Sequence, residues 1–170
     1  MESHVLSVLV RNSSGVLTRV SGLFARRGFN IDSLTVGRTE NPESSRMTIT
    51  LNGSEDVLEQ FTKQLNKLED VLRVLNLKFE NSVYRELVLI KVKADAEQRA
   101  AVNEVVKIFR SKIIDVSPET LTIELTGDES KINALIKLLE EYEIKELVRT
   151  GVCALERGSN DITDYCEIFN

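Results

Sequence analysis

The order of hydrophobic patterns along this chain occurs twice. Between residues 5 and 77, segments with the period of a strand or of a helix follow one another as strand, helix, strand, strand, helix, strand. The same order returns between residues 86 and 155, although the residues themselves hardly repeat. Each series is typical of a four-stranded antiparallel sheet with two helices on one face, the ferredoxin-like arrangement. We therefore expect an α+β chain of two ferredoxin-like βαββαβ units, over residues 1–78 and 79–158, and a tail at 159–170 that the sequence leaves either disordered or docked.

The first series begins with a strand over residues 5–11, whose almost continuous apolarity is typical of a strand that is covered on both faces or lies at an interface. Arg26, Arg27 and Gly28 end the first helix with basic residues and a glycine cap, and Ser54 can cap the second helix. The apolar stripes of the two helices are Val16, Leu17, Val20, Leu23 and Phe24, then Val57, Leu58, Phe61, Leu65 and Leu68. The other strands are predicted at residues 29–37, 47–51 and 71–77.

The second series starts with a strand over residues 86–93 and ends with a strand over residues 147–155. Two shorter strands, 113–116 and 121–125, are predicted on either side of a turn at residues 117–119. The two helices are indicated by Ala101, Val102, Val105, Val106 and Phe109, and by Ile132, Leu135, Ile136 and Leu139.

A ferredoxin-like unit leaves the second face of its sheet bare and its edge strands unpaired. Proteins resolve this liability by pairing with a second copy. A unit of ~80 residues also has a small core, so burial of an apolar face against a partner adds useful stability. We therefore expect a homodimer or a larger oligomer.

Charge and composition restrict the partners of the chain. Its 170 residues carry a formal charge of −5, and Lys and Arg are scattered through every segment. This balance argues against nucleic acid and against an anionic membrane as partners. Because no apolar run approaches the ~20 residues that span a bilayer and no leader pattern opens the chain, we expect a cytoplasmic protein.

Residues for catalysis are scarce. The single histidine, His4, lies near the N-terminus, so the commonest general base and metal ligand is missing from any plausible cleft. Cys153 and Cys166 are too few and too dispersed for a disulfide framework or a zinc cluster, and we expect both to be reduced and structural. A Gly-rich phosphate loop and a paired nucleophile and base are also missing, so we expect no catalytic residue, no metal site and no cofactor in this chain.

The polar turn at residues 12–15 precedes the first helix. The N-terminus of a helix presents free backbone N–H groups and a partial positive charge, which suit a small anion. Asn12 offers an amide that donates and accepts, and Gly15 lets the backbone approach a ligand. Taken alone, the signal is weak, because most turns of this kind before a helix are only caps.

Several stretches together resemble the small, regulatory subunit of acetohydroxyacid synthase, also called acetolactate synthase. They are residues 6–10, 12–17, 19–20, 22–24, 27–36, 45–49, 71–74, 85–87, 108–110, 113–116 and 149–152. The resemblance extends over about residues 4–158 and leaves out the tail. It implies an N-terminal ACT domain for effector binding and dimerisation, a C-terminal ACT-like domain, and a homodimer at least.

The resemblance also implies a function. Small subunits of this family perform no chemistry; they raise the activity of a larger catalytic subunit in branched-chain amino-acid biosynthesis and make it sensitive to feedback inhibition, usually by valine. Thiamine diphosphate, Mg²⁺ and FAD, which the reaction of the family requires, are then expected on the catalytic subunit.

The family's effector lies between two ACT domains. Carried across by position, Asn12, Gly15 and the N–H groups of Val16 and Leu17 bind the effector carboxylate, and Asn30 of the neighbouring subunit binds its amino group. Ile31 and Leu9 are candidates for an apolar wall, and each is equally consistent with an ordinary core residue. Without the resemblance, Asn30 reads as a cap or turn residue.

Two other functions were weighed. A stand-alone amino-acid-binding module, such as the effector domain of a transcription factor, would need an attached DNA reader, and no basic helix-turn-helix precedes the first strand. An enzyme of ferredoxin-like architecture stays open because fold alone does not exclude activity.

Overall fold

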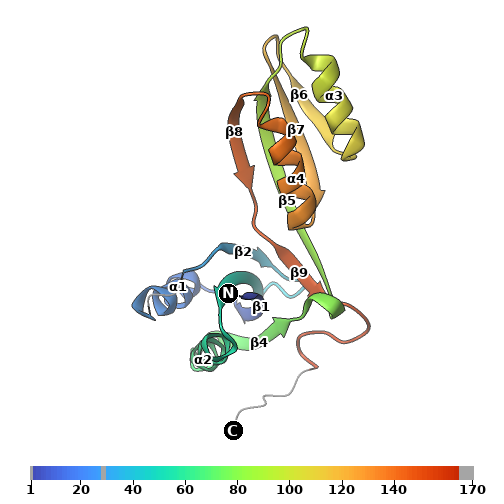
Figure 1. The fold of residues 1–170 in the computed structure, drawn as a ribbon. Helices are drawn as coiled ribbons and strands as arrows, with labels where there is room; N and C mark the ends of the chain where they lie inside the picture. Colours follow the sequence, from blue (N-terminus) through green and yellow to red (C-terminus); the bar gives the residue numbers. More distant parts are fainter. Residues whose placement is uncertain (1, 28–29, 165–170) are drawn as a thin grey trace. The chain divides into compact units, whose positions relative to one another are not determined.

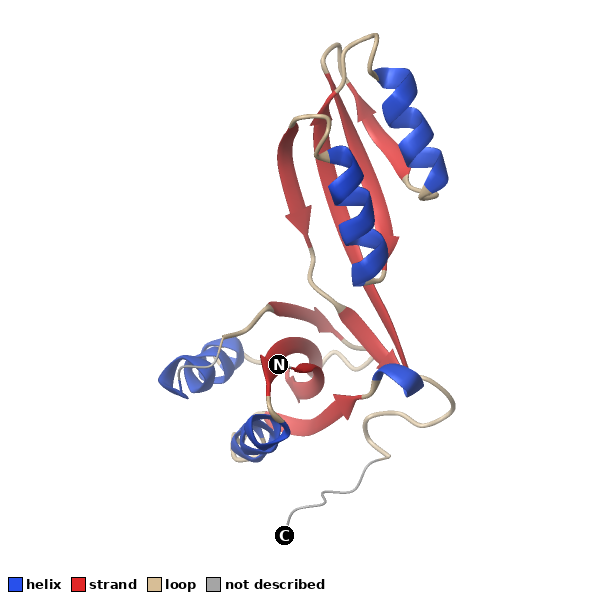
Figure 2. Cartoon of the chain, in the orientation of Figure 1, coloured by secondary structure: helices blue, strands red, loops and turns tan. Residues whose placement is uncertain are grey.

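The computed structural model describes residues 2–27 and 30–164. Its elements follow the order βαββαβ twice, as expected, and one further strand ends the series (Figures 1 and 2). The first set is β1 (Glu2–Arg11), α1 (Val16–Arg27), β2 (Ser33–Arg38), β3 (Ser44–Gly53), α2 (Glu55–Leu65) and β4 (Val71–Leu77). After a 3₁₀ turn (Phe79–Asn81), the second set is β5 (Ser82–Lys93), α3 (Arg99–Ile108), β6 (Lys112–Val116), β7 (Thr120–Gly127), α4 (Glu129–Leu139), β8 (Ile144–Arg149) and β9 (Cys153–Glu156). The cap predicted at Gly28, the residue Cys166 and the end of the tail lie outside the described residues.

Both sheets have the strand order of a ferredoxin-like fold. The first runs β2-β3-β1-β4 and the second β6-β7-β5-β8, with β9 also pairing with β5. The ladders within the two four-stranded paths are antiparallel. The predicted fold class, α+β with two βαββαβ units, is confirmed.

The first core forms where α1 and α2 cover one face of the first sheet. Alternate residues of β1, Leu6, Val8 and Val10, point into this core and are buried. Phe24 of α1 and Phe61 of α2 meet there with ring centroids 4.0 Å apart. The apolar stripes that predicted the helices therefore supply the packing, although Leu17 and Val57 stay outside the core.

The second core repeats the arrangement with α3 and α4 on one face of the second sheet (Figure 2). Its strands contribute alternate residues, which are Val88, Ile90 and Val92 of β5 and Leu121, Ile123 and Leu125 of β7. The outward residues of β5, such as Leu87 and Leu89, are half-buried.

The prediction of one strand over residues 147–155 is wrong, because the structure has two strands there, β8 and β9. The chain turns after β8, where Gly151 has a φ of 84°, and resumes as β9. A positive φ interrupts the extended backbone of a strand and is readily adopted by glycine. By contacts, residues up to Val83 form one unit together with those from Val152 onward, and Tyr84–Gly151 form the other. The sequence placed the two boundaries at residues 78 and 158 instead, because it read the last strand as part of the second unit.

Residues 152–164, here called the covering segment, pack on the face of the first sheet that the helices leave open. β9 contacts both β1 and β4, and the backbone N–H of Val152 donates to Ser33 Oγ at 3.4 Å. The outward residues of β1, Val5, Ser7 and Leu9, are all buried. The prediction of a strand covered on both faces is therefore confirmed for β1. The expectation that the second face of the first sheet is bare is wrong, because residues 152–164 of the same chain pack on it.

The far end of the covering segment is held by a turn and by charge. The hydroxyl and the backbone N–H of Thr163 donate to Asp161, and these bonds lower the pKa of that carboxyl, to which the positive Arg46 of β3 adds a smaller effect. Ile162, between them in sequence, is 5% exposed.

Three smaller observations complete the description. His4 is buried in β1 and its Nε2 lies 3.2 Å from the carbonyl oxygen of Gly53, so it is not at a frayed end. Cys153 is a free thiol on the exposed side of β9 rather than a core residue. Within residues 2–27 and 30–164, no helix is both long and apolar enough to cross a bilayer.

A first prediction concerns Asp128, the N-cap of α4. Its Oδ1 accepts from the backbone N–H of Lys131 at 2.9 Å and from Ser130 Oγ at 2.7 Å, and these two bonds lower the pKa of the carboxyl from its ordinary value. Asp128→Ala is expected to lower the free energy of unfolding by about 1 kcal/mol in urea titrations at neutral pH.

Asp128→Asn is the matched control, because asparagine caps a helix equally well but carries no charge. Since the folded pKa of Asp128 lies below its unfolded value, its charged cap contributes fully above about pH 4 and is lost as the pH falls through the folded pKa. The stability difference between the unmodified chain and the Asp128→Asn variant should therefore vary with pH only in the acid range. A difference that is constant from neutral to acid pH would contradict this assignment.

A second prediction concerns the covering segment. Ile162→Ala is expected to cost about 2–5 kcal/mol, as for other buried isoleucines, and to increase hydrogen exchange at the amides of β1. Leu155→Ala is the control in the same segment; Leu155 is 58% exposed, so its loss should change stability by no more than about 0.5 kcal/mol. Equal effects of the two substitutions would show that the segment is not packed on the sheet.

Candidate functional site

The turn after β1 is attached to the hairpin that joins β2 and β3. The backbone N–H of Asn12 donates to the carbonyl of Glu43 at 2.7 Å, and Asn12 Nδ2 donates to the carbonyl of Pro42 at 2.9 Å. A primary amide has two N–H groups and a carbonyl oxygen, so this bond uses only one of the donors of Asn12. The side chain is thus held in place with donor capacity to spare.

Gly15 occupies a conformation that the turn requires. Its φ is 82°, and its carbonyl accepts the first helical bond, from the N–H of Arg19 at 3.0 Å. A Cβ at this position would lie 3.0 Å from Arg19 Nη1. Glycine therefore allows both the positive φ and a close approach over the start of α1.

The start of α1 keeps the partial positive charge of a helix N-terminus. The first turn of α1 contains no acidic residue to offset the partial charge of its N–H groups. Arg19 lies one turn further on, where its Nε donates to Asp70 Oδ2 at 2.5 Å. The sequence alone did not single out Arg19 as a site residue, although it follows Gly15 by four residues, about one helical turn.

Val16 and Leu17 differ in what they offer a ligand. The side chain of Val16 is buried in the first core, so only its backbone could meet a ligand. Leu17 is 46% exposed, which leaves its side chain as well as its N–H on the surface.

Asn30 and Ile31 precede β2. Asn30 is exposed, and its Nδ2 donates to Asp32 Oδ1 at 3.1 Å. Ile31 is half-buried and packs against the first core, and Leu9 is buried on the outer face of β1. Both apolar residues therefore have an ordinary packing role in the structure.

The pairing registers place the two asparagines at opposite ends of the first sheet. Asn12 follows Arg11, which pairs with Ser44. Asn30 precedes Ser33, which pairs with Thr50, and Thr50 pairs with Val5. Val5 and Arg11 are six residues apart in β1, or about 20 Å at the rise of a strand. One chain alone therefore does not bring Asn12 and Asn30 to a common ligand of amino-acid size.

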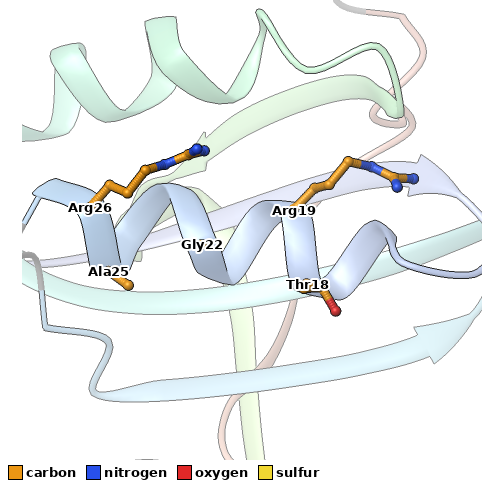
Figure 3. A pocket seen from close by; sticks show the side chains of 5 residues that line it. All are labelled: Thr18, Arg19, Gly22, Ala25 and Arg26. Carbon is orange, nitrogen blue, oxygen red and sulfur yellow. The ribbon is translucent and has the colours of Figure 1, made fainter.

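A shallow groove of about 380 Å³ lies on α1, lined by Thr18, Arg19, Gly22, Ala25 and Arg26. In Figure 3 the two arginines extend from one side of the helix, and Thr18 and Ala25 point to another. The groove contains none of the predicted effector residues, although its Arg19 also lies beside Gly15. It is an open surface rather than an enclosed pocket.

Residues 2–27 and 30–164 contain no cluster of three or more His, Cys, Asp or Glu side chains that could hold a metal ion.

Comparison with known proteins identifies relatives over nearly the whole chain. Residues 6–73 match the family model of the AHAS small subunit-like ACT domain, and residues 85–158 match that of the small subunit of acetolactate synthase. The acetolactate synthase small subunit of Mycolicibacterium smegmatis is 52% identical over 160 residues, 94% of each chain. A probable acetolactate synthase small subunit of Archaeoglobus fulgidus is 53% identical over 156 residues, 92% of this chain and 98% of that one. The crystal structure of the small subunit from Thermotoga maritima aligns with a TM-score of 0.88 at 45% identity, over 94% of this chain and 100% of that one.

Proposed function

Since this chain belongs to the family of acetolactate synthase small subunits, we propose that it binds a catalytic large subunit in the cytoplasm and raises the activity of that subunit. It also makes the catalytic subunit sensitive to inhibition by a branched-chain amino acid, and valine is the first candidate. Thiamine diphosphate, Mg²⁺ and FAD are then cofactors of the large subunit. The proposed role of this chain is regulation without chemistry of its own.

The observation that supports the proposal best is the separation of Asn12 and Asn30. β2 lies at the edge of the first sheet, and its Val36 is 44% exposed. If two copies pair their β2 strands antiparallel about a two-fold axis, Ser33 of one copy faces Arg38 of the other. Arg38 leads into the hairpin that holds Asn12. The pairing therefore brings Asn30 of one copy towards Asn12 of its partner.

A site shared in this way suits a zwitterionic amino acid. The carboxylate meets the N–H groups of Val16 and Leu17 at the start of α1, with Gly15 allowing close approach and the guanidinium of Arg19, which Asp70 holds, offering further donors. The ammonium group meets the amide of the partner's Asn30. The exposed side chain of Leu17 and the edge of Ile31 offer apolar contact to a branched side chain.

The alternative is a stand-alone amino-acid-binding ACT module that acts on another partner. Assay of acetolactate formation distinguishes the two. Added to its catalytic subunit, the chain should raise the rate, and valine should then lower it. An unchanged rate, together with amino-acid binding by the isolated chain, would favour the alternative.

A third prediction tests the anion end of the site. Gly15→Asp introduces a carboxylate where the effector carboxylate is proposed to bind, and the new side chain also lies beside Arg19 and offsets its charge. Aspartate tolerates a positive φ better than most residues, so the turn should survive. The reconstituted enzyme should keep its stimulation, while the valine concentration for half inhibition rises about tenfold or more, which corresponds to a loss of about 1.4 kcal/mol.

Gly22→Asp is the control for charge. It adds the same charge to the same helix at a position where a Cβ meets no atom within 4 Å. This variant should keep its inhibition, and an unchanged midpoint for Gly15→Asp would place the effector elsewhere.

A fourth prediction tests whether two chains share each site. Asn12→Ala and Asn30→Ala should each remove effector binding from the homodimer. A heterodimer of the two variants, isolated with two affinity tags, should regain one of its two sites, because one site then has both amides and the other has neither. Calorimetric titration counts the sites, and a heterodimer without binding would indicate that each site lies within one chain.

A further inference from the structure

Asp32 holds two asparagine side chains beside the proposed ammonium end of the site. Its Oδ1 accepts from Asn30 Nδ2 at 3.1 Å, and its Oδ2 accepts from Asn52 Nδ2 at 2.8 Å. Asn30 lies in the turn before β2, whereas Asn52 comes from β3. One carboxylate thus joins the candidate ligand residue to the body of the sheet.

These bonds determine which way the amide of Asn30 points. An ionised carboxylate only accepts hydrogen bonds, so the NH₂ end of Asn30, and not its carbonyl end, must face Asp32. The carbonyl oxygen of Asn30 is then directed to the other side of the amide. A carbonyl oxygen accepts a hydrogen bond, which is the property needed to bind an ammonium group.

The turn that carries Asp32 is fastened to β3. The backbone N–H of Asp32 donates to the carbonyl of Thr50 at 2.9 Å, and Ser33 Oγ donates to Thr50 Oγ1 at 3.1 Å. With the bond from Asn52, Asp32 and the adjacent Ser33 make three contacts to β3. A group fixed in this way does not have to be ordered when the ligand binds, which favours affinity.

The charge of Asp32 favours an ammonium group, as does the orientation that Asp32 gives to Asn30. A carboxylate beside the ligand attracts an ammonium group and repels the carboxylate of the same ligand. The start of α1 in the partner copy has the opposite preference. The shared site therefore favours one orientation of a zwitterionic ligand, with its ammonium group near Asp32 and its carboxylate at the start of α1 of the partner copy.

We propose that Asp32 is a positioning residue that makes the site select ligands with an α-ammonium group over the corresponding α-hydroxy acids. This inference rests on the proposed function, because it assumes that Asn30 contributes to an amino-acid site. Asp32 acts through Asn30 and through its charge, without contact with the reacting atoms of any catalytic subunit.

The experiment is calorimetric titration of the full-length protein with L-valine and with (S)-2-hydroxy-3-methylbutanoate, which has the same carboxylate and side chain but a hydroxyl in place of the ammonium. Asp32→Asn is expected to weaken valine binding about tenfold or more, the scale of a charge-assisted hydrogen bond. Binding of the hydroxy acid should be unchanged or tighter, since its carboxylate no longer meets Asp32. The preference for valine therefore falls, while retained binding of the hydroxy acid shows that the site is intact.

Two further variants separate charge from position. Asn52→Ala keeps the carboxylate but removes one of its contacts, so it should weaken valine binding less than Asp32→Asn does. Asp56→Asn makes the same change of charge in the first turn of α2 and should leave both ligands unaffected.

Equal weakening of the two ligands by Asp32→Asn would overturn the inference, since that is the result of a purely structural role. Unchanged valine binding would overturn it as well. If the unmodified chain binds none of valine, leucine and isoleucine, the proposed function fails, and this inference fails with it. The two failures are thereby distinguished.

Discussion

Burial of β1 on both of its faces is the constraint on which the first unit depends. Leu6, Val8 and Val10 face the helices, and Val5, Ser7 and Leu9 face the covering segment. Because successive side chains of a strand point to opposite faces, a shift of register by one residue would exchange these two sets and place Ser7 in the aromatic core. The register of β1 with β3 and β4 is therefore strongly specified. The same register places Asn12 and Asn30 at opposite ends of the sheet, so the geometry of the candidate site follows from the packing of one strand.

Much of the fold could be predicted from the sequence because local patterns carry it. The strand at residues 71–77 was predicted with the bounds that β4 has, and the helical stripes matched the buried residues Val20, Phe24, Leu58 and Phe61. The course of the chain after residue 150 could not be predicted. Gly151 lies inside an apolar run that reads as one strand, and nothing local to Ala154 or Ile162 indicates which sheet buries them. Contacts between distant parts of the chain decided the outcome.

Some residues of the candidate site could likewise be predicted from local sequence, whereas others depend on contacts between distant parts of the chain. Asn12 and Gly15 could be singled out because a polar turn before a helix has a general electrostatic property. Asn30 was identified by resemblance alone, and its link to Asn52 through Asp32 depends on the pairing of β2 with β3, which a sequence read without structure does not supply. Arg19 was missed for a related reason, since the approach of its guanidinium to Gly15 depends on the conformation of a long side chain, which the sequence does not determine.

The first unit is made from both ends of the chain, with Tyr84–Gly151 inserted between them. During synthesis the N-terminal residues leave the ribosome first, and the helices α1 and α2 can cover their face of the sheet while the rest is still being translated. The opposite face of β1 cannot be covered until residues 152–164 have emerged, after the whole inserted unit. Until residues 152–164 take their place, Val5 and Leu9 of β1 therefore lie on an open apolar face.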